Sequence, residues 1–131
     1  MQRDSMQSDV QARVEIPPGT LQMLILKTLS WGPAHGYAIA QQIKRTTDDV
    51  LHAEEGSLYP ALQKMLLKGW VTAEWVSAGT RRRARVYHLT PEGREQLANE
   101  VSEFTRAMRA IVRVIEPALE ANHEVVPSAS A

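Results

Sequence analysis

Four arginines lie within five positions of the sequence, at Arg81, Arg82, Arg83 and Arg85, next to residues typical of a turn. The guanidinium group is always charged, and its planar donors match the oxygens of a phosphate or the edge of a guanine. Charge runs are often only solvated surface. Here the dense cluster at a turn favours contact with the phosphates or the minor groove of a nucleic acid, made by about two or three of the four arginines.

The charges are segregated along the chain. The 131-residue sequence carries 15 basic and 15 acidic residues, so its formal net charge is zero. Between residues 20 and 90, nine Lys and Arg stand against five Asp and Glu, which gives +4, and the flanking segments carry the compensating −4. The central segment is therefore the part suited to a polyanionic partner.

A short amphipathic helix is predicted just before the arginines. Ser57 is expected to be its N-cap, Pro60 to lie in its first turn and Gly69 to end it. Its inward face is predicted to hold Leu58, Leu62, Met65 and Leu66, and its outward face Ser57, Ala61, Lys64 and Lys68. Lys64 is a candidate for a base edge or a phosphate, and the hydroxyls of Ser57 and Tyr59 lie where the helix dipole favours a phosphate. Tyr59 could instead lie at the edge of the core.

A β-hairpin that carries the arginines is predicted to follow this helix. Residues 71–76 alternate and include β-branched and aromatic types, residues 77–80 are typical of a turn, and residues 85–89 form a second short strand. The arginines then lie at or near the tip of the hairpin. The three tryptophans, Trp31, Trp70 and Trp75, are interpreted as packing anchors.

Two helices are predicted upstream. The first begins after Thr20 as N-cap and ends at Trp31, and its apolar face is so broad that it must be buried on two sides. The second runs from Tyr37 to about Thr46, with Tyr37, Ile39, Ala40 and Ile43 inward. Tyr37 is also included among the candidate DNA contacts. Residues 47–55 are expected to form a connection.

The last helix has a heptad seam. It is predicted to start at Pro91 with Thr90 as N-cap, and Pro117 is expected to close it. Its apolar residues step by four and three positions, as in a coiled coil, at Leu97, Val101, Phe104, Met108, Ile111 and Ile115. The seam could pack only against its own domain, but a two-fold dimer would cover it and the first helix together. Such a dimer would hold its two DNA-reading helices roughly 34 Å apart, or at a small multiple of that distance.

The order of elements is that of a winged helix-turn-helix, and the sequence resembles the PadR family of bacterial transcriptional regulators between about residues 21 and 97. The resemblance rests on five short motifs, at residues 26–29, 35–39, 56–62, 69–71 and 85–93. It implies a dimeric repressor that binds an inverted-repeat operator, with the final helix building the dimer. A small-molecule effector between the helices of the dimer stays an open alternative.

The expected fold is mainly α with a small β-hairpin: a flexible N-terminal arm at 1–16, a winged helix-turn-helix domain at 17–90, a dimerisation helix at 91–121 and a disordered tail at 122–131. The predicted partners are double-stranded DNA and a second copy of the chain. A winged-helix module that binds only proteins is the alternative, and a gel shift on random duplex would separate the two.

An enzyme is not expected. The sequence has no cysteine, and His35, His52 and His88 lack the spacing of a metal site, so no metal or cofactor is predicted. His35 is expected to hydrogen-bond locally where the second helix begins. No apolar run approaches the roughly 20 residues that span a bilayer. The expected location is the cytoplasm.

Overall fold

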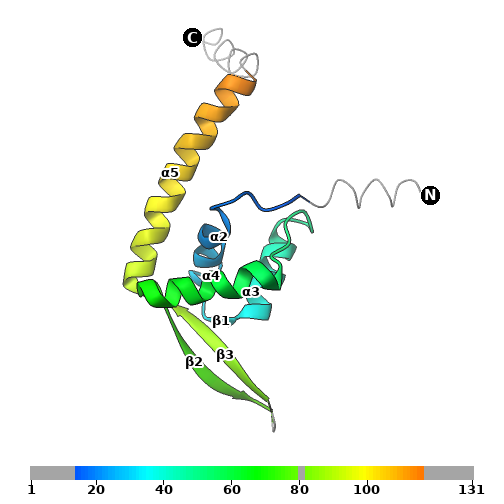
Figure 1. Ribbon diagram of the computed structural model, residues 1–131, viewed down its shortest axis with the longest axis vertical. Helices are drawn as coiled ribbons and strands as arrows, with labels where there is room; N and C mark the ends of the chain where they lie inside the picture. The colour runs from blue at the N-terminus through cyan, green and yellow to red at the C-terminus, as the bar shows by residue number, and fades with distance from the viewer. Residues whose placement is uncertain (1–13, 80–81, 117–131) are drawn as a thin grey trace, which may run out of the picture. The chain divides into compact units, whose positions relative to one another are not determined.

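The computed structural model describes residues 14–79 and 82–116 (Figure 1). Its elements are, in chain order, α2 (Leu21–Leu29), β1 (Ala34–His35), α3 (Gly36–Thr46), α4 (Glu55–Lys68), β2 (Val71–Ala78), β3 (Arg82–Leu89) and α5 (Pro91–Ile115). This order confirms the predicted succession of three helices, a hairpin and a long helix. The predicted tail and most of the predicted N-terminal arm lie outside the described residues.

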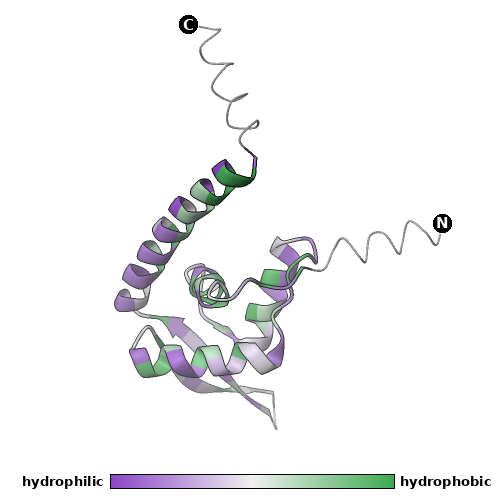
Figure 2. Cartoon of the chain, turned by 45° about the horizontal axis from the view of Figure 1, so that its top comes forward, coloured by the Kyte–Doolittle hydropathy of each residue, from purple (hydrophilic) through white to green (hydrophobic). Residues whose placement is uncertain are grey.

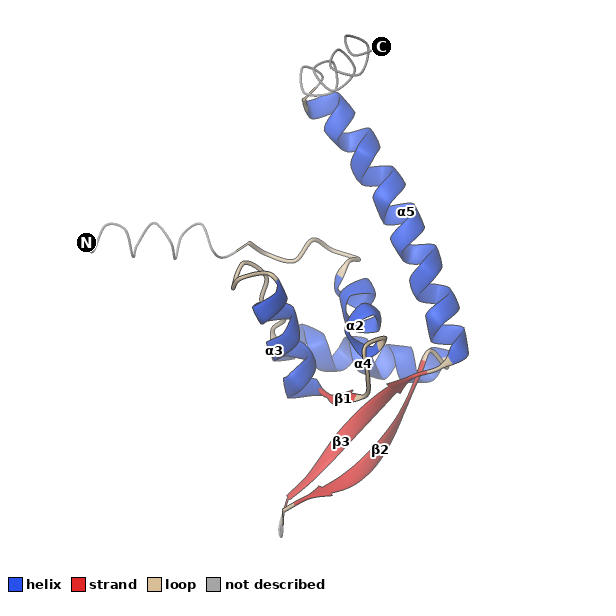
Figure 3. Ribbon diagram, turned by 180° about the vertical axis from the view of Figure 1, so that it is seen from behind, coloured by secondary structure: helices blue, strands red, loops and turns tan. Residues whose placement is uncertain are grey.

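The strands form an antiparallel sheet in the order β1-β3-β2 (Figure 3). The β2–β3 hairpin is paired along its whole length, from Val71 opposite Leu89 to Ala78 opposite Arg82. β1 pairs with the other edge of β3, where Ala34 lies opposite Tyr87. β1 was not expected from the sequence, because a two-residue strand is too short to show alternation.

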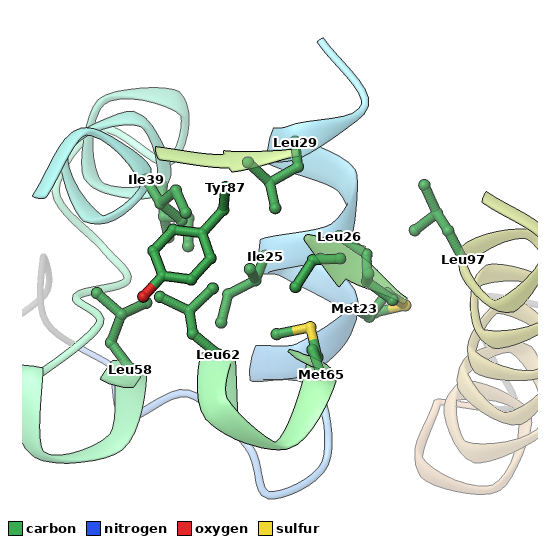
Figure 4. Close-up of a cluster of buried hydrophobic side chains, with 12 residues drawn as sticks. Met23, Ile25, Leu26, Leu29, Ile39, Leu58, Leu62, Met65, Tyr87 and Leu97 are labelled. Atoms are coloured by element: carbon green, nitrogen blue, oxygen red, sulfur yellow. The ribbon is translucent and has the colours of Figure 1, made fainter. Parts of the chain in front are cut away.

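A single hydrophobic core joins the first three helices to the base of the hairpin (Figure 4). Its buried members are Met23, Ile25, Leu26, Leu29, Ile39, Ile43, Leu58, Leu62, Met65, Val71, Tyr87 and Leu97. The remaining leucines of α2, Leu21 and Leu24, are partly buried against it. The inner side of α2 is therefore buried within the chain, Leu21 and Leu24 stay partly exposed, and the expectation that a second copy covers the rest stays a prediction.

The start of α4 differs from the prediction. The helix begins at Glu55, because the amides of Ser57 and Leu58 both donate to the carbonyl of Glu54. Ser57 therefore lies inside the first turn and is not the N-cap, and Pro60 lies one turn further into the helix than predicted. An acidic residue, Glu55, suits the first turn, where the helix dipole is positive.

The predicted C-terminus of α4 and the predicted cap of α5 are confirmed. Gly69 has a left-handed φ of +78°, and the amide of Trp70 donates to the carbonyl of Met65 across it. The hydroxyl oxygen of Thr90 accepts from the amide of Gly93 at 2.9 Å and donates to the carbonyl of Gly69 at 2.8 Å. Thr90 thus fixes the start of α5 to the end of α4.

The chain divides into two compact units between Leu97 and Ala98. The first unit holds the sheet, α2, α3, α4 and the start of α5, and Leu97 is the last buried residue of its core. The second unit continues α5 to Ile115, with hydrophilic and hydrophobic residues mixed along the helix (Figure 2). No helix in the described ranges is long and apolar enough to cross a membrane.

Candidate nucleic-acid interface

The outward face of α4 is exposed. Its inward face packs into the core as predicted, which leaves Ser57, Gln63 and Lys64 open to solvent. Leu67, which is 80% exposed, shares this surface near the end of the helix. Leu67 was not among the residues expected on this surface, although its position in the helix lies outside the spacing of the inward face. An exposed leucine beside an exposed lysine suits a DNA groove, because thymine presents a methyl group there.

Tyr59 lies at the edge of the core and is partly exposed, so its placement fits both interpretations. Its ring packs over Gly36, where an added Cβ would lie 2.6 Å from the ring, yet the side chain is 43% exposed. Burial of the Tyr59 hydroxyl raises its pKa above the usual value, and electrostatic repulsion from Glu55 and Tyr87 raises it further. The hydroxyl therefore stays protonated at neutral pH and can donate a hydrogen bond to a phosphate oxygen.

Tyr37 lies on the outer side of α3, not in the core. It is 64% exposed, and its hydroxyl accepts a hydrogen bond of 2.6 Å from the side chain of Gln41. The inward prediction for Tyr37 is wrong, because the buried face of α3 is set by Ile39 and Ile43, and Tyr37 is two positions away from Ile39, about 200° around the helix. Exposure leaves Tyr37 available as a surface contact.

His35 begins α3 as predicted. Its backbone is extended, and its ring nitrogen Nδ1 accepts a hydrogen bond of 3.3 Å from the amide of Ala38. The ring also stacks on that of Tyr37, with 6.5 Å between the centroids. The local hydrogen bond accounts for this histidine without a metal, and the described residues contain no group of three or more potential metal ligands.

Arg82, Arg83 and Arg85 lie on β3, in the outer half of the hairpin beside its tip, which agrees with the predicted place at or near the tip. The strand begins at Arg82, three residues earlier than predicted, with Arg83 opposite Ser77 and Arg85 opposite Trp75. Arg81 lies outside the described residues. The predicted strand was too short because the arginines before Arg85 were assigned to the turn. The outer half of this hairpin is solvated, so its strands need no apolar alternation to pair.

Trp75 is exposed and lies beside two of these arginines. Its side chain is 57% exposed, and the guanidinium carbons of Arg83 and Arg85 are 4.9 Å and 5.5 Å from the ring centroid. The interpretation of Trp75 as a packing anchor is wrong, as it also is for the equally exposed Trp31. The alternation of β2 does place Trp75 on the face of the strand that points to the hydrophobic core. The core covers only the base of the hairpin, however, and does not reach Trp75. Only the strand register, which the sequence does not give, places it opposite Arg85.

The predicted seam of α5 is exposed from its second position onward. Val101, Phe104, Met108, Ile111 and Ile115 are all exposed in the second unit. Leu97 differs from them, because it is buried in the core of the first unit. The exposed seam therefore begins at Val101, and Leu97 serves the fold of its own chain.

Comparison with known proteins identifies the family of this chain. Residues 25–99 match the model of the transcriptional regulator PadR-like family. The chain is 30% identical over 77 residues to the negative transcriptional regulator PadR of Bacillus subtilis strain 168, and the match covers 59% of this chain and 42% of that protein. The chain spans 23% of another curated relative that it matches.

Solved structures share the fold. A transcriptional regulator from Clostridium thermocellum superposes with a TM-score of 0.69 at 25% identity, over 72% of this chain and 92% of that one. Bacillus subtilis PadR in complex with operator DNA superposes with a TM-score of 0.59 at 28% identity, over 63% of this chain and 46% of that one. The family match covers the winged-helix elements from α2 into α5, which confirms the resemblance seen in the sequence. The chain belongs to the PadR-like family of transcriptional regulators.

Proposed function

We propose that this chain regulates transcription by binding double-stranded DNA as a homodimer, most simply as a repressor at an inverted-repeat operator. The observation that carries the proposal is the placement of Arg83 and Arg85 along β3, in the same compact unit as the exposed face of α4 that bears Lys64. A helix for the major groove and a cationic hairpin for the flanking backbone together make a DNA-reading unit.

The two parts have different tasks in this proposal. Arg82, Arg83, Arg85 and the undescribed Arg81 supply charge to the phosphates, which gives affinity without sequence preference. Lys64 and Leu67 on α4 supply contacts to base edges, which give sequence preference. The protonated hydroxyl of Tyr59, near the start of α4, donates a hydrogen bond to a phosphate oxygen. This bond sets the orientation of α4 on the DNA.

Two observations and one geometric argument support the homodimer and the repressor. The exposed apolar residues of α5 from Val101 to Ile115 form a heptad seam suited to a second copy. A two-fold dimer presents two α4 helices to two half-sites, which an inverted repeat provides. The Bacillus subtilis relative is itself a negative regulator.

Charge removal from the hairpin tests the DNA contact. Wild-type protein is expected to bind random-sequence duplex with an affinity that falls steeply as salt rises. Replacing Arg82 and Arg83 together by alanine should weaken binding to every duplex about tenfold near 0.1 M salt, because phosphate contacts and released counterions are lost. The slope of log affinity against log salt should flatten by about one unit for each lost contact. Fluorescence anisotropy over a salt series measures both.

The matched control replaces Arg106 and Arg109, two exposed arginines of α5, by alanine. This pair removes the same charge and should leave the slope nearly unchanged. Equal slopes for the hairpin pair and the wild type would contradict the proposed contact. Indifference of the wild type to duplex at low salt would favour a module that binds proteins only.

Lys64 should control sequence preference. We expect Lys64→Ala to change the ranking of duplexes selected from a random pool by about tenfold at the most affected base pair, because a base contact is worth about 1–3 kcal/mol. Lys68→Ala is the control on the same helix, since the Lys68 ammonium lies over the ring of Trp70 at 5.4 Å. An unchanged ranking with uniformly weaker binding would reassign Lys64 to the phosphate backbone.

A further inference from the structure

We propose that Trp75 is a positioning residue, which holds Arg83 and Arg85 in place on the hairpin before DNA arrives. The inference rests on the proposed function, because it assigns Trp75 a role in the contact between the hairpin and DNA. It concerns a side chain that itself need not touch the duplex.

The strand register brings the three side chains together. Trp75 on β2 lies directly opposite Arg85 on β3, and Arg83 is the next residue along the same face of that strand. Both guanidinium carbons lie within the distance of about 6 Å at which a cation is attracted to the face of an aromatic ring. Tryptophan is the strongest aromatic partner for such a cation.

Arg85 is the more tightly held of the two. Its guanidinium carbon lies 5.5 Å from the centroid of Trp75 and 6.0 Å from that of Tyr87, so two rings flank it, and Tyr87 is itself anchored in the core. Its Nε atom is buried and has no hydrogen-bond partner in the described part of the chain. Ring contacts, in place of hydrogen bonds, therefore hold this side chain.

Holding arginine by rings preserves its charge for DNA. Among the described residues, neither Arg83 nor Arg85 takes part in an ion pair with an acidic residue. A carboxylate would order an arginine equally well, but it would also neutralise the charge that a phosphate needs. An aromatic ring restricts the side chain and leaves the positive charge free to attract a phosphate.

Order before binding raises affinity. Fixing a long side chain at an interface costs conformational entropy, and that cost is smaller when the free protein already restricts it. Loss of Trp75 should therefore weaken DNA binding while the number of phosphate contacts stays the same. The salt slope counts those contacts, so it separates a positioning residue from a contact residue.

The first test uses the free, full-length protein labelled with ¹⁵N. The Nε–Hε signal of Arg85, assigned by its loss in Arg85→Lys, is expected to exchange slowly with water, because Nε is buried. Trp75→Leu should raise this exchange rate about tenfold, and Trp75→Phe should keep it within about threefold of the wild type. An unchanged rate in Trp75→Leu would overturn the inference without any reference to DNA.

The second test measures duplex binding over a salt series. Trp75→Leu should lower affinity about three- to tenfold with the wild-type slope, and Trp75→Phe should recover most of the loss. Trp31→Leu is the matched control, because Trp31 is equally exposed and also lies near a cation, the ammonium of Lys27 at 5.9 Å. It should leave affinity unchanged.

The outcomes separate the two proposals. If the wild type binds duplex and Trp75→Leu binds equally well, the positioning role is wrong and the proposed function stands. If the wild type does not bind duplex, the proposed function is wrong, and the exchange measurement still decides whether Trp75 orders the arginines. A reduced salt slope in Trp75→Leu would show that phosphate contacts are lost together with the ring, and this would overturn the positioning role.

Discussion

Replacing Gly93 by alanine should lower the free energy of unfolding by about 3 kcal/mol, because the new methyl group has no room. A Cβ at this position would lie 2.1 Å from the carbonyl oxygen of Trp70 and 2.7 Å from a methyl carbon of Leu89. The nearer atom belongs to the backbone, so no side-chain rotation can relieve the contact. Thermal or urea unfolding, followed by circular dichroism at fixed protein concentration, measures the loss.

The surrounding hydrogen bonds explain why the backbone cannot yield cheaply. The carbonyl of Trp70 accepts from the amide of Thr90 at 3.1 Å, and the hydroxyl of Thr90 binds both the carbonyl of Gly69 and the amide of Gly93. Moving α5 away from Trp70 would weaken this junction between α4, β3 and α5. The effect on stability therefore comes from steric overlap and from the loss of a helix cap together.

Gly56 provides the matched control for this substitution. It is also a glycine in the first turn of a helix, α4, but it is exposed, and no atom lies within 4 Å of the position of an added Cβ. Gly56→Ala should change the free energy of unfolding by less than about 1 kcal/mol, and in the stabilising direction, because alanine favours helix. If both variants were as stable as the wild type, this result would contradict the close contact between the start of α5 at Gly93 and the carbonyl of Trp70.

The elements that the sequence predicted well are those with strong local signals. Leu58, Leu62 and Met65 repeat at helical spacing and are buried. Thr90 before Pro91 gave the start of α5, since a side-chain cap and a proline at the first helical position act within one turn. The family motifs then indicated the fold, because each of them is present and they follow one another in the family's order along the chain.

The parts that could not be predicted depend on contacts between distant residues. The register that sets Trp75 opposite Arg85 is fixed by pairing along the whole hairpin, and nothing local in either strand specifies it. The start of α4 was misplaced because Ser57 is a good N-cap by type, whereas the carbonyl of Glu54 already accepts the first helical hydrogen bonds. Tyr37 was misplaced because its aromatic type was given more weight than its spacing, since it lies two positions, or about 200°, from Ile39 on the helix.

The same distinction applies to the candidate site. Charge density identified the arginines, since a run of cations is visible in any sequence. Which arginines lie on a strand, and which ring they lie against, required the fold. Leu67 was not singled out and Trp75 was interpreted as a packing anchor for one reason: an apolar residue is expected to be buried, and only the fold shows where the core ends.

Replacing Val101 and Met108 together by aspartate should convert the protein to a monomer at micromolar concentration. Both residues are exposed in the chain and lie on the heptad seam of α5. In a two-fold dimer each substitution would bury a charge twice without a partner, at a cost of several kcal/mol, which exceeds what a short helical seam can offset. Sedimentation velocity on the full chain measures the change in mass.

Ser102→Asp with Ala110→Asp is the control for this pair, because it adds the same charge to exposed positions of α5 off the seam. It should remain a dimer. The core that ends at Leu97 is untouched in both variants, so the monomer should keep its winged-helix unit and still bind random duplex, with roughly half the salt slope of the dimer. Dimers that persist in the seam variant would show that the second copy is held by another surface.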